Sequence, residues 1–166
     1  MSSTTLQLHL ADEEATNALA QQLAPLVAGH THEVAMGGRI HLHGELGAGK
    51  THFVRALLQA VGVSGRIKSP SYALLESYKV SSLYCYHLDF YRFSDAREWL
   101  DAGFRDILQE DALVLIEWPE KAGNLLPPPD LDLHLDYAQE GRRATLHARS
   151  TKGKIWISRL NPSRPR

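Results

Sequence analysis

The stretch that decides the fold is HGELGAGKTHFVRALL, residues 43–58. Gly44, Gly49, Lys50 and Thr51 fit the pattern G-x-x-x-x-G-K-[ST], a glycine-rich loop that binds phosphate groups. A strand-like run ends just before Gly44, and apolar residues at helical spacing follow Lys50. Glycines let the N–H groups of such a loop converge, and a helix N-terminus adds positive potential. The pattern and its context therefore predict a nucleotide phosphate site formed by Gly44, Glu45, Leu46, Gly47, Ala48, Gly49, Lys50 and Thr51.

The rest of the sequence predicts one α/β domain over residues 1–160, followed by a flexible tail over 161–166. We expect a P-loop NTPase-like sheet with parallel core strands, added antiparallel strands and helices on both faces. Helices are expected at 13–29, 50–61 and 95–108, with Pro25 and Gly29 ending the first. Strands are expected at 4–10, 36–44, 71–80, 83–93, 112–118, 127–137, 142–148 and 154–160. The runs at 71–80 and 83–93, separated by Ser81 and Ser82, are expected to form a hairpin.

Composition limits the classes of partner. The formal net charge is −1, which gives no broad basic surface, so we expect no DNA binding and only indirect contact with RNA. The single cysteine, Cys85, excludes an internal disulfide and favours a reducing compartment. No apolar run reaches the roughly 20 residues that a membrane span needs. These features predict a cytoplasmic protein without a membrane partner.

Acidic residues near two predicted strand ends indicate a metal and catalytic centre. Glu117 closes the apolar run ALVLIE, where a buried parallel strand presents its end to a ligand, and we expect it to hold Mg²⁺ together with Thr51. In HLDFYR, residues 87–92, period-two alternation puts His87, Asp89 and Tyr91 on one strand face. Such a row can orient water or bind Mg²⁺, and an exposed polar hairpin face is an equal alternative.

Two further features have weaker signals. Ser69 and Ser71 lie in KSPSY, a turn placed where segments that sense the γ-phosphate occur in this class of fold. His41 and His43 flank the loop strand, and we interpret both as structural or exposed residues, not as metal ligands.

Taken together, GELGAGKT, SPSY, HLDFYR and LIEWPE resemble, in this order and spacing, the bacterial TsaE (YjeE) family. The resemblance extends from about Leu10 to about Leu146. Members are small ATPases required for threonylcarbamoyladenosine formation on tRNA. The resemblance implies a P-loop α/β sheet, ATP bound at residues 44–51, and Mg²⁺ held by Thr51 and Glu117. It also implies TsaB- and TsaD-type partner proteins, through which tRNA would be reached.

The resemblance also implies roles for single residues. It implies a functionally important aspartate at Asp89 and a tryptophan at Trp118 that senses the nucleotide or a partner, whereas composition alone leaves core packing open for Trp118. It places the N-terminal segment near the nucleotide, with Glu13 or Thr16 in contact. Two positions depart from the family: Ser71 stands where threonine is usual, and His52 stands where a second threonine often follows Thr51.

Two other functions compete with an accessory ATPase in which Lys50 and Asp89 are catalytic. A small-molecule kinase could use the same loop, but it needs arginines on a mobile lid, and the sequence contains no evident lid insertion. A GTP-driven switch is disfavoured because no N/T-K-x-D stretch is present to recognise guanine.

Overall fold

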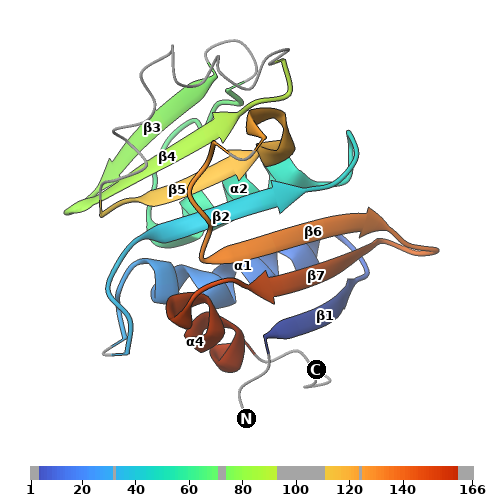
Figure 1. Ribbon diagram of the computed structural model, residues 1–166, viewed down its shortest axis with the longest axis horizontal. Helices are drawn as coiled ribbons and strands as arrows, with labels where there is room; N and C mark the ends of the chain where they lie inside the picture. The colour runs from blue at the N-terminus through green and yellow to red at the C-terminus, as the bar shows by residue number, and fades with distance from the viewer. Residues whose placement is uncertain (1–3, 32, 71–73, 93–110, 124, 161–166) are drawn as a thin grey trace.

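The fold is built around a seven-stranded sheet of order β1-β7-β6-β2-β5-β4-β3 (Figure 1). The computed structural model describes residues 4–31, 33–70, 74–92, 111–123 and 125–160. The strands are β1 (Thr5–Leu10), β2 (Gly38–His43), β3 (Leu75–Val80), β4 (Leu83–Asp89), β5 (Leu113–Glu117), β6 (Leu131–Tyr137) and β7 (Arg142–Ala148).

The centre of the sheet is parallel and its edges are antiparallel. β2 pairs in parallel with β5 and β6, and β5 pairs in parallel with β4. β7 and β1 extend one side in antiparallel pairs, and β3 forms the predicted hairpin with β4 on the other side. The mixed sheet with a parallel core is therefore confirmed.

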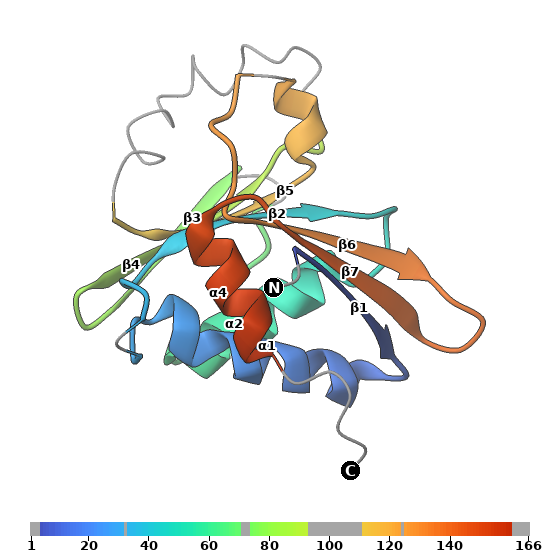
Figure 2. The same ribbon diagram turned by 60° about the horizontal axis from the view of Figure 1, so that its bottom comes forward.

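Helices lie on both faces of the sheet, as predicted, but unequally. In the described ranges the α-helices are α1 (Glu13–Val27), α2 (Lys50–Val61) and α4 (Thr151–Arg159), and all three lie below the sheet in Figure 2. The short 3₁₀ helix η2 (Pro119–Ala122) lies on the opposite side in the same view. The Asp12 side chain accepts a hydrogen bond from the N–H of Ala15 at 2.9 Å and caps α1 as its sequence position predicts.

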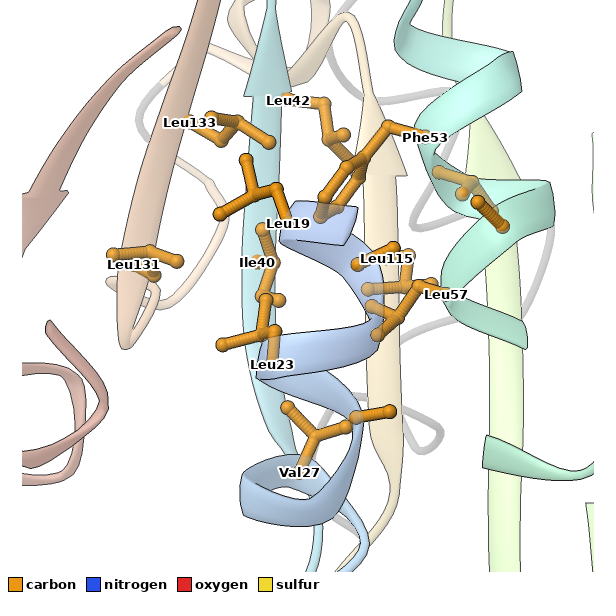
Figure 3. Close-up of a cluster of buried hydrophobic side chains, with 14 of the residues drawn as sticks. Leu19, Leu23, Val27, Ile40, Leu42, Phe53, Leu57, Leu115, Leu131 and Leu133 are labelled. Carbon is orange, nitrogen blue, oxygen red and sulfur yellow. The ribbon is translucent and has the colours of Figure 1, made fainter. Parts of the chain in front are cut away.

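The main core lies between the sheet and the α-helices (Figure 3). Strand alternation points Ile40 and Leu42 of β2 toward the helices, and both are fully buried. A second apolar cluster lies on the other face of the sheet and contains Leu88, Phe90 and, from β5, Val114 and Ile116. Every residue of β5 is buried, as its continuous apolar run predicts. The two cores hold the carboxyl ends of β2, β5 and β4 in fixed register. Figure 3 labels Leu19, Leu23, Val27, Ile40, Leu42, Phe53, Leu57, Leu115, Leu131 and Leu133.

Two predictions of secondary structure were wrong. Residues 154–159 form the end of a helix, α4, instead of a strand, and Leu160 is its C-cap. Ser150 caps the helix at its start, and Gly153, Trp156 and Ile157 bury one face at a spacing of three and four. Pro25 also does not end α1, which continues to Val27.

Some predictions fall outside the described residues. These are the helix at 95–108, Ser71 and the tail at 161–166. In the part of the chain that is described, no helix is long and apolar enough to cross a membrane.

Candidate functional site

The loop between β2 and α2 depends on glycine for its shape. Gly44 has φ 149°, and a Cβ there would lie 2.5 Å from the carbonyl oxygen of Leu135. Gly49 has φ 108° and directly precedes α2, whose first N–H groups have no acceptor within the helix. The N–H of Ala48 donates to the carbonyl of Glu45 at 3.0 Å and closes the turn. This arrangement is the one that binds phosphate at a helix N-terminus.

The loop borders a cavity of about 650 Å³, within the range typical of small-molecule sites. Sequence-predicted residues from five separate segments line it: Glu13, Leu46, Gly47, Ala48, Gly49, Lys50, Thr51, Ser69, Asp89, Tyr91, Glu117 and Trp118. Thr16, the alternative to Glu13, also lines it. Gly44, Glu45 and His87 do not, and Ser71 is not described.

Thr51 and Glu117 meet at the floor of this cavity. The Thr51 hydroxyl lies 3.0 Å from each carboxylate oxygen of Glu117 and donates to them. Behind Glu117, the Nε2 atom of His87 lies 2.6 Å from Oε2, and both side chains are almost completely buried. His87 therefore fixes the orientation of the carboxylate and does not itself reach the cavity.

Asp89 lies beside Glu117 because β4 and β5 pair in parallel with these two residues as Cα partners. Its Oδ1 accepts a hydrogen bond from the N–H of Tyr91 at 2.9 Å. Burial raises the pKa of Asp89 above its ordinary value, the hydrogen bond from Tyr91 opposes this, and the negative charge of Glu117 adds to it. A carboxylate in this position is suited to accept a proton or orient water.

Lys50 is 4% exposed and is held by two groups. Its Nζ donates to the carbonyl of Gly44 and lies 3.6 Å from the centre of the Trp118 ring. Burial lowers the pKa of Lys50, and nearby carboxylates, led by Glu117, oppose the shift. Trp118 has φ 58°, an unusual backbone conformation for a large residue, and its ring also contacts the ring of Tyr91.

Sequence reasoning missed the residues that approach the loop from the β6–β7 hairpin and from α1. Tyr137 and Arg142 donate hydrogen bonds to carbonyls of the loop, and Arg142 lines the cavity. His52, where the family often has threonine, has Nε2 3.0 Å from Oδ1 of Asn17 in α1.

The two histidines that flank the loop strand are structural, as interpreted from the sequence. His41 is buried, and burial lowers its pKa to about 4. His43 has Nε2 2.7 Å from Oδ1 of Asp132 and stacks on the ring of His134 at 4.3 Å. Burial opposes ionisation of Asp132, but hydrogen bonds from His43 and Arg149 outweigh it and lower the Asp132 pKa to about 2.

The Thr51 hydroxyl and the Glu117 carboxylate fit Mg²⁺, which prefers oxygen ligands. In nucleotide sites this ion takes few protein ligands and completes its shell with phosphate oxygens and water. Among the residues described, no group of three or more His, Cys, Asp or Glu is placed to hold a metal ion by itself. The residues present therefore suit an ion that arrives with phosphate.

The fold is shared with a solved structure. The crystal structure of Bacillus subtilis YdiB is similar to this chain with a TM-score of 0.74. The match covers 93% of this chain and 95% of that chain at 24% sequence identity. It shows that the two have the same fold.

Sequence comparisons identify the family. A family model described as "Threonylcarbamoyl adenosine biosynthesis protein TsaE" matches residues 10–145. The tRNA threonylcarbamoyladenosine biosynthesis protein TsaE of Haemophilus influenzae is 40% identical over 129 residues, which is 78% of this chain and 80% of that protein. The protein of the same description from Rickettsia felis is 36% identical over 137 residues, 82% of this chain and 75% of its own length. The chain therefore belongs to the TsaE family.

Proposed function

We propose that this protein is a Mg²⁺-dependent ATPase that supports threonylcarbamoyladenosine modification of tRNA, in the cytoplasm, with TsaB- and TsaD-type partners. The relatives from Haemophilus influenzae and Rickettsia felis carry the name of that biosynthetic process. The observation that carries the proposal is the contact of Thr51 with Glu117 at 3.0 Å beside a glycine-rich loop. Proteins commonly bind a nucleoside triphosphate and its metal ion with such an arrangement.

Each residue of the centre has a distinct role in the proposal. The N–H groups of the loop and the ammonium of Lys50 bind the phosphates. Thr51 and Glu117 hold Mg²⁺, which neutralises charge on the phosphates when it is bound. Asp89, one strand away from Glu117, orients the attacking water and accepts its proton. Glu13 and Thr16 border the cavity at the start of α1. In the proposal, Glu13 or Thr16 contacts the nucleotide.

Partner dependence follows from the charges in the cavity. Of the basic residues that line the cavity, Lys50 is turned toward Gly44 and Trp118, the Arg142 guanidinium is engaged with loop carbonyls, and Arg92 is exposed. Positive charge added at the transition state can raise the rate of phosphoryl transfer by roughly 10³–10⁵. We therefore infer slow hydrolysis by the isolated chain and faster hydrolysis when a partner docks at the cavity.

Exposed apolar side chains support docking at that position. Leu46 is 61% exposed and Tyr91 is 43% exposed, and both border the cavity. Exposed apolar side chains that gather around a ligand site can form part of a protein interface. Ser69 and Trp118 border the same cavity, so a partner there would sense whether nucleotide is bound. The net charge of −1 favours tRNA contact through the complex instead of through this chain alone.

The test is ATP turnover by the chain alone, with purified TsaB and TsaD, and with tRNA added. We expect a low basal rate, stimulation by the partners, and loss of both in Lys50→Ala, with the exposed Lys154→Ala as the matched control. Brisk hydrolysis by the isolated chain without stimulation would contradict the accessory role. Phosphate transfer to a small acceptor would instead establish the kinase alternative.

A further inference from the structure

The β6–β7 hairpin contacts the phosphate-binding loop, and its residue Arg142 also lines the cavity. Figure 1 shows the turn of this hairpin on the same side of the molecule as the loop that follows β2. Tyr137 ends β6 and Arg142 begins β7, and they are Cα partners across the strand pair. Their side chains therefore leave the same face of the sheet, the face on which α2 begins.

These two residues bind three consecutive carbonyl groups of the loop. The Tyr137 hydroxyl donates to the carbonyl of Leu46 at 2.9 Å. The Arg142 guanidinium donates through one terminal nitrogen to the carbonyl of Gly47 at 3.2 Å, and through Nε to the carbonyl of Ala48 at 3.1 Å. The guanidinium also lies 4.5 Å from the Tyr137 ring, so each side chain fixes the other.

The direction of these carbonyls decides the direction of the N–H groups that bind phosphate. A peptide unit is planar and trans, so the N–H that follows a carbonyl points the opposite way. Carbonyls of Leu46 and Ala48 held toward the hairpin therefore turn the N–H groups of Gly47 and Gly49 away from it. Without the hairpin, each of these peptide units could rotate, and phosphate binding would have to restrict them.

We propose that Arg142 and Tyr137 are positioning residues that hold the phosphate-binding loop in its binding conformation before the nucleotide arrives. This inference rests on the proposed function, because it assumes that the loop binds phosphate. Gly47 fits the same arrangement, since a Cβ there would lie 2.8 Å from the Tyr137 hydroxyl. A side chain at position 47 would displace the tyrosine from the loop.

The test is calorimetric titration of Mg·ATP and of Mg·tripolyphosphate, which has no base. We expect Arg142→Ala to weaken both ligands equally, by about tenfold to a hundredfold, because hydrogen bonds from a charged group are lost. Tyr137→Phe should weaken both by about threefold to tenfold. The matched control is Arg143→Ala, which removes the same charge from the neighbouring, exposed position and should change affinity less than twofold.

Two further measurements separate positioning from other roles. Arg142→Lys keeps the positive charge but lacks the planar guanidinium with its several N–H donors, so its affinity for both ligands should stay low. The melting temperature of the ligand-free Arg142→Ala protein should stay near that of the wild type, because the contacts are local to the loop.

Other binding results would contradict either this inference or the proposed function, and they can be told apart. Wild-type affinity in Arg142→Ala, or full rescue by Arg142→Lys, would overturn the inference and leave the proposed function intact. Weaker ATP binding with unchanged tripolyphosphate binding would also overturn it, since Arg142 would then act on the nucleoside. Absence of ATP binding by the wild-type chain would instead contradict the proposed function itself.

Discussion

The ammonium group of Lys50 lies 3.6 Å from the centre of the Trp118 ring, in contact distance for a cation–π interaction. Lys50 is the first residue of α2, and Trp118 directly follows β5, so the contact joins the phosphate-binding loop to the strand that carries Glu117. In this conformation Lys50 also donates to the carbonyl of Gly44, so two groups of the chain hold its ammonium at the lining of the cavity. If Lys50 binds phosphate as proposed, the phosphate and the Trp118 ring compete for the same ammonium group.

This competition predicts a fluorescence signal. When Mg·ATP binds, Lys50 should leave the Trp118 ring, and the tryptophan emission should change. We expect the change to disappear in Trp118→Phe while calorimetry still detects binding. Trp156 is fully buried in the core and should not respond. A signal of wild-type size in Trp118→Phe would show that Trp118 is not the reporter.

Glu117 and Asp89 should differ in what their loss changes. Glu117→Gln should raise the Mg²⁺ concentration needed for half-maximal turnover, by about tenfold or more, because one ion ligand is weakened. Asp89→Asn should lower turnover by about 10²-fold or more with nucleotide affinity largely kept, because a proton acceptor is lost. The measurements are turnover against Mg²⁺ concentration and calorimetric affinity for both variants. An equal loss of nucleotide affinity in both would exclude this division of roles.

His41 predicts a stability change with pH. Its pKa is lowered from 6.5 to about 4, so between these values the unfolded chain binds a proton that the folded chain does not. The stability from this group is therefore complete above pH 6.5 and falls as the pH is lowered toward 4, by up to about 3 kcal/mol. The free energy of unfolding in urea should fall less over this range in His41→Gln than in the wild type. His9→Gln, at an exposed position, is the control, and an identical pH slope in all three proteins would contradict the prediction.

Ser150 predicts a stability effect at α4. Its hydroxyl accepts from the N–H of Gly153 at 3.0 Å and donates to Oδ1 of Asp130 at 2.7 Å. Ser150→Ala should therefore lower the free energy of unfolding by about 1–2 kcal/mol. Thr151→Ala, at the exposed next position, should change it by less than about 0.5 kcal/mol. Equal urea midpoints for Ser150→Ala and the wild type would show that the cap contributes little.

Local patterns in the sequence were sufficient to predict most of the fold. The loop, α2 and β5 are predicted from the positions of glycines and the spacing of apolar residues, which are local patterns in the sequence. The segment 154–160 has a strand-like pattern because Ile155, Trp156 and Ile157 are strand formers. Its helix depends on the Ser150 cap and on burial of Trp156. Tertiary packing outweighed local preference there.

The site was predictable only where its residues occur in motifs. Lys50, Thr51 and Glu117 follow from the loop pattern and from the end of a buried strand. Arg142 and Tyr137 contact the loop across 91 to 95 residues of sequence, and no local pattern records such contacts. His87 was placed with Asp89 by alternation, but its burial behind Glu117 became visible only in the structure.

The backbone of Trp118 sets a limit on what can replace it. At φ 58° a residue with a Cβ has a higher conformational energy, by roughly 1–2 kcal/mol, than in the right-handed region. Glycine would remove that cost, and asparagine would reduce it, whereas valine or isoleucine would increase it. The stability of variants at position 118 should therefore follow how readily each residue adopts a positive φ, and not the size of its side chain. The contacts of the Trp118 ring with Lys50 and Tyr91 are therefore made from a backbone conformation that lowers the stability of the fold.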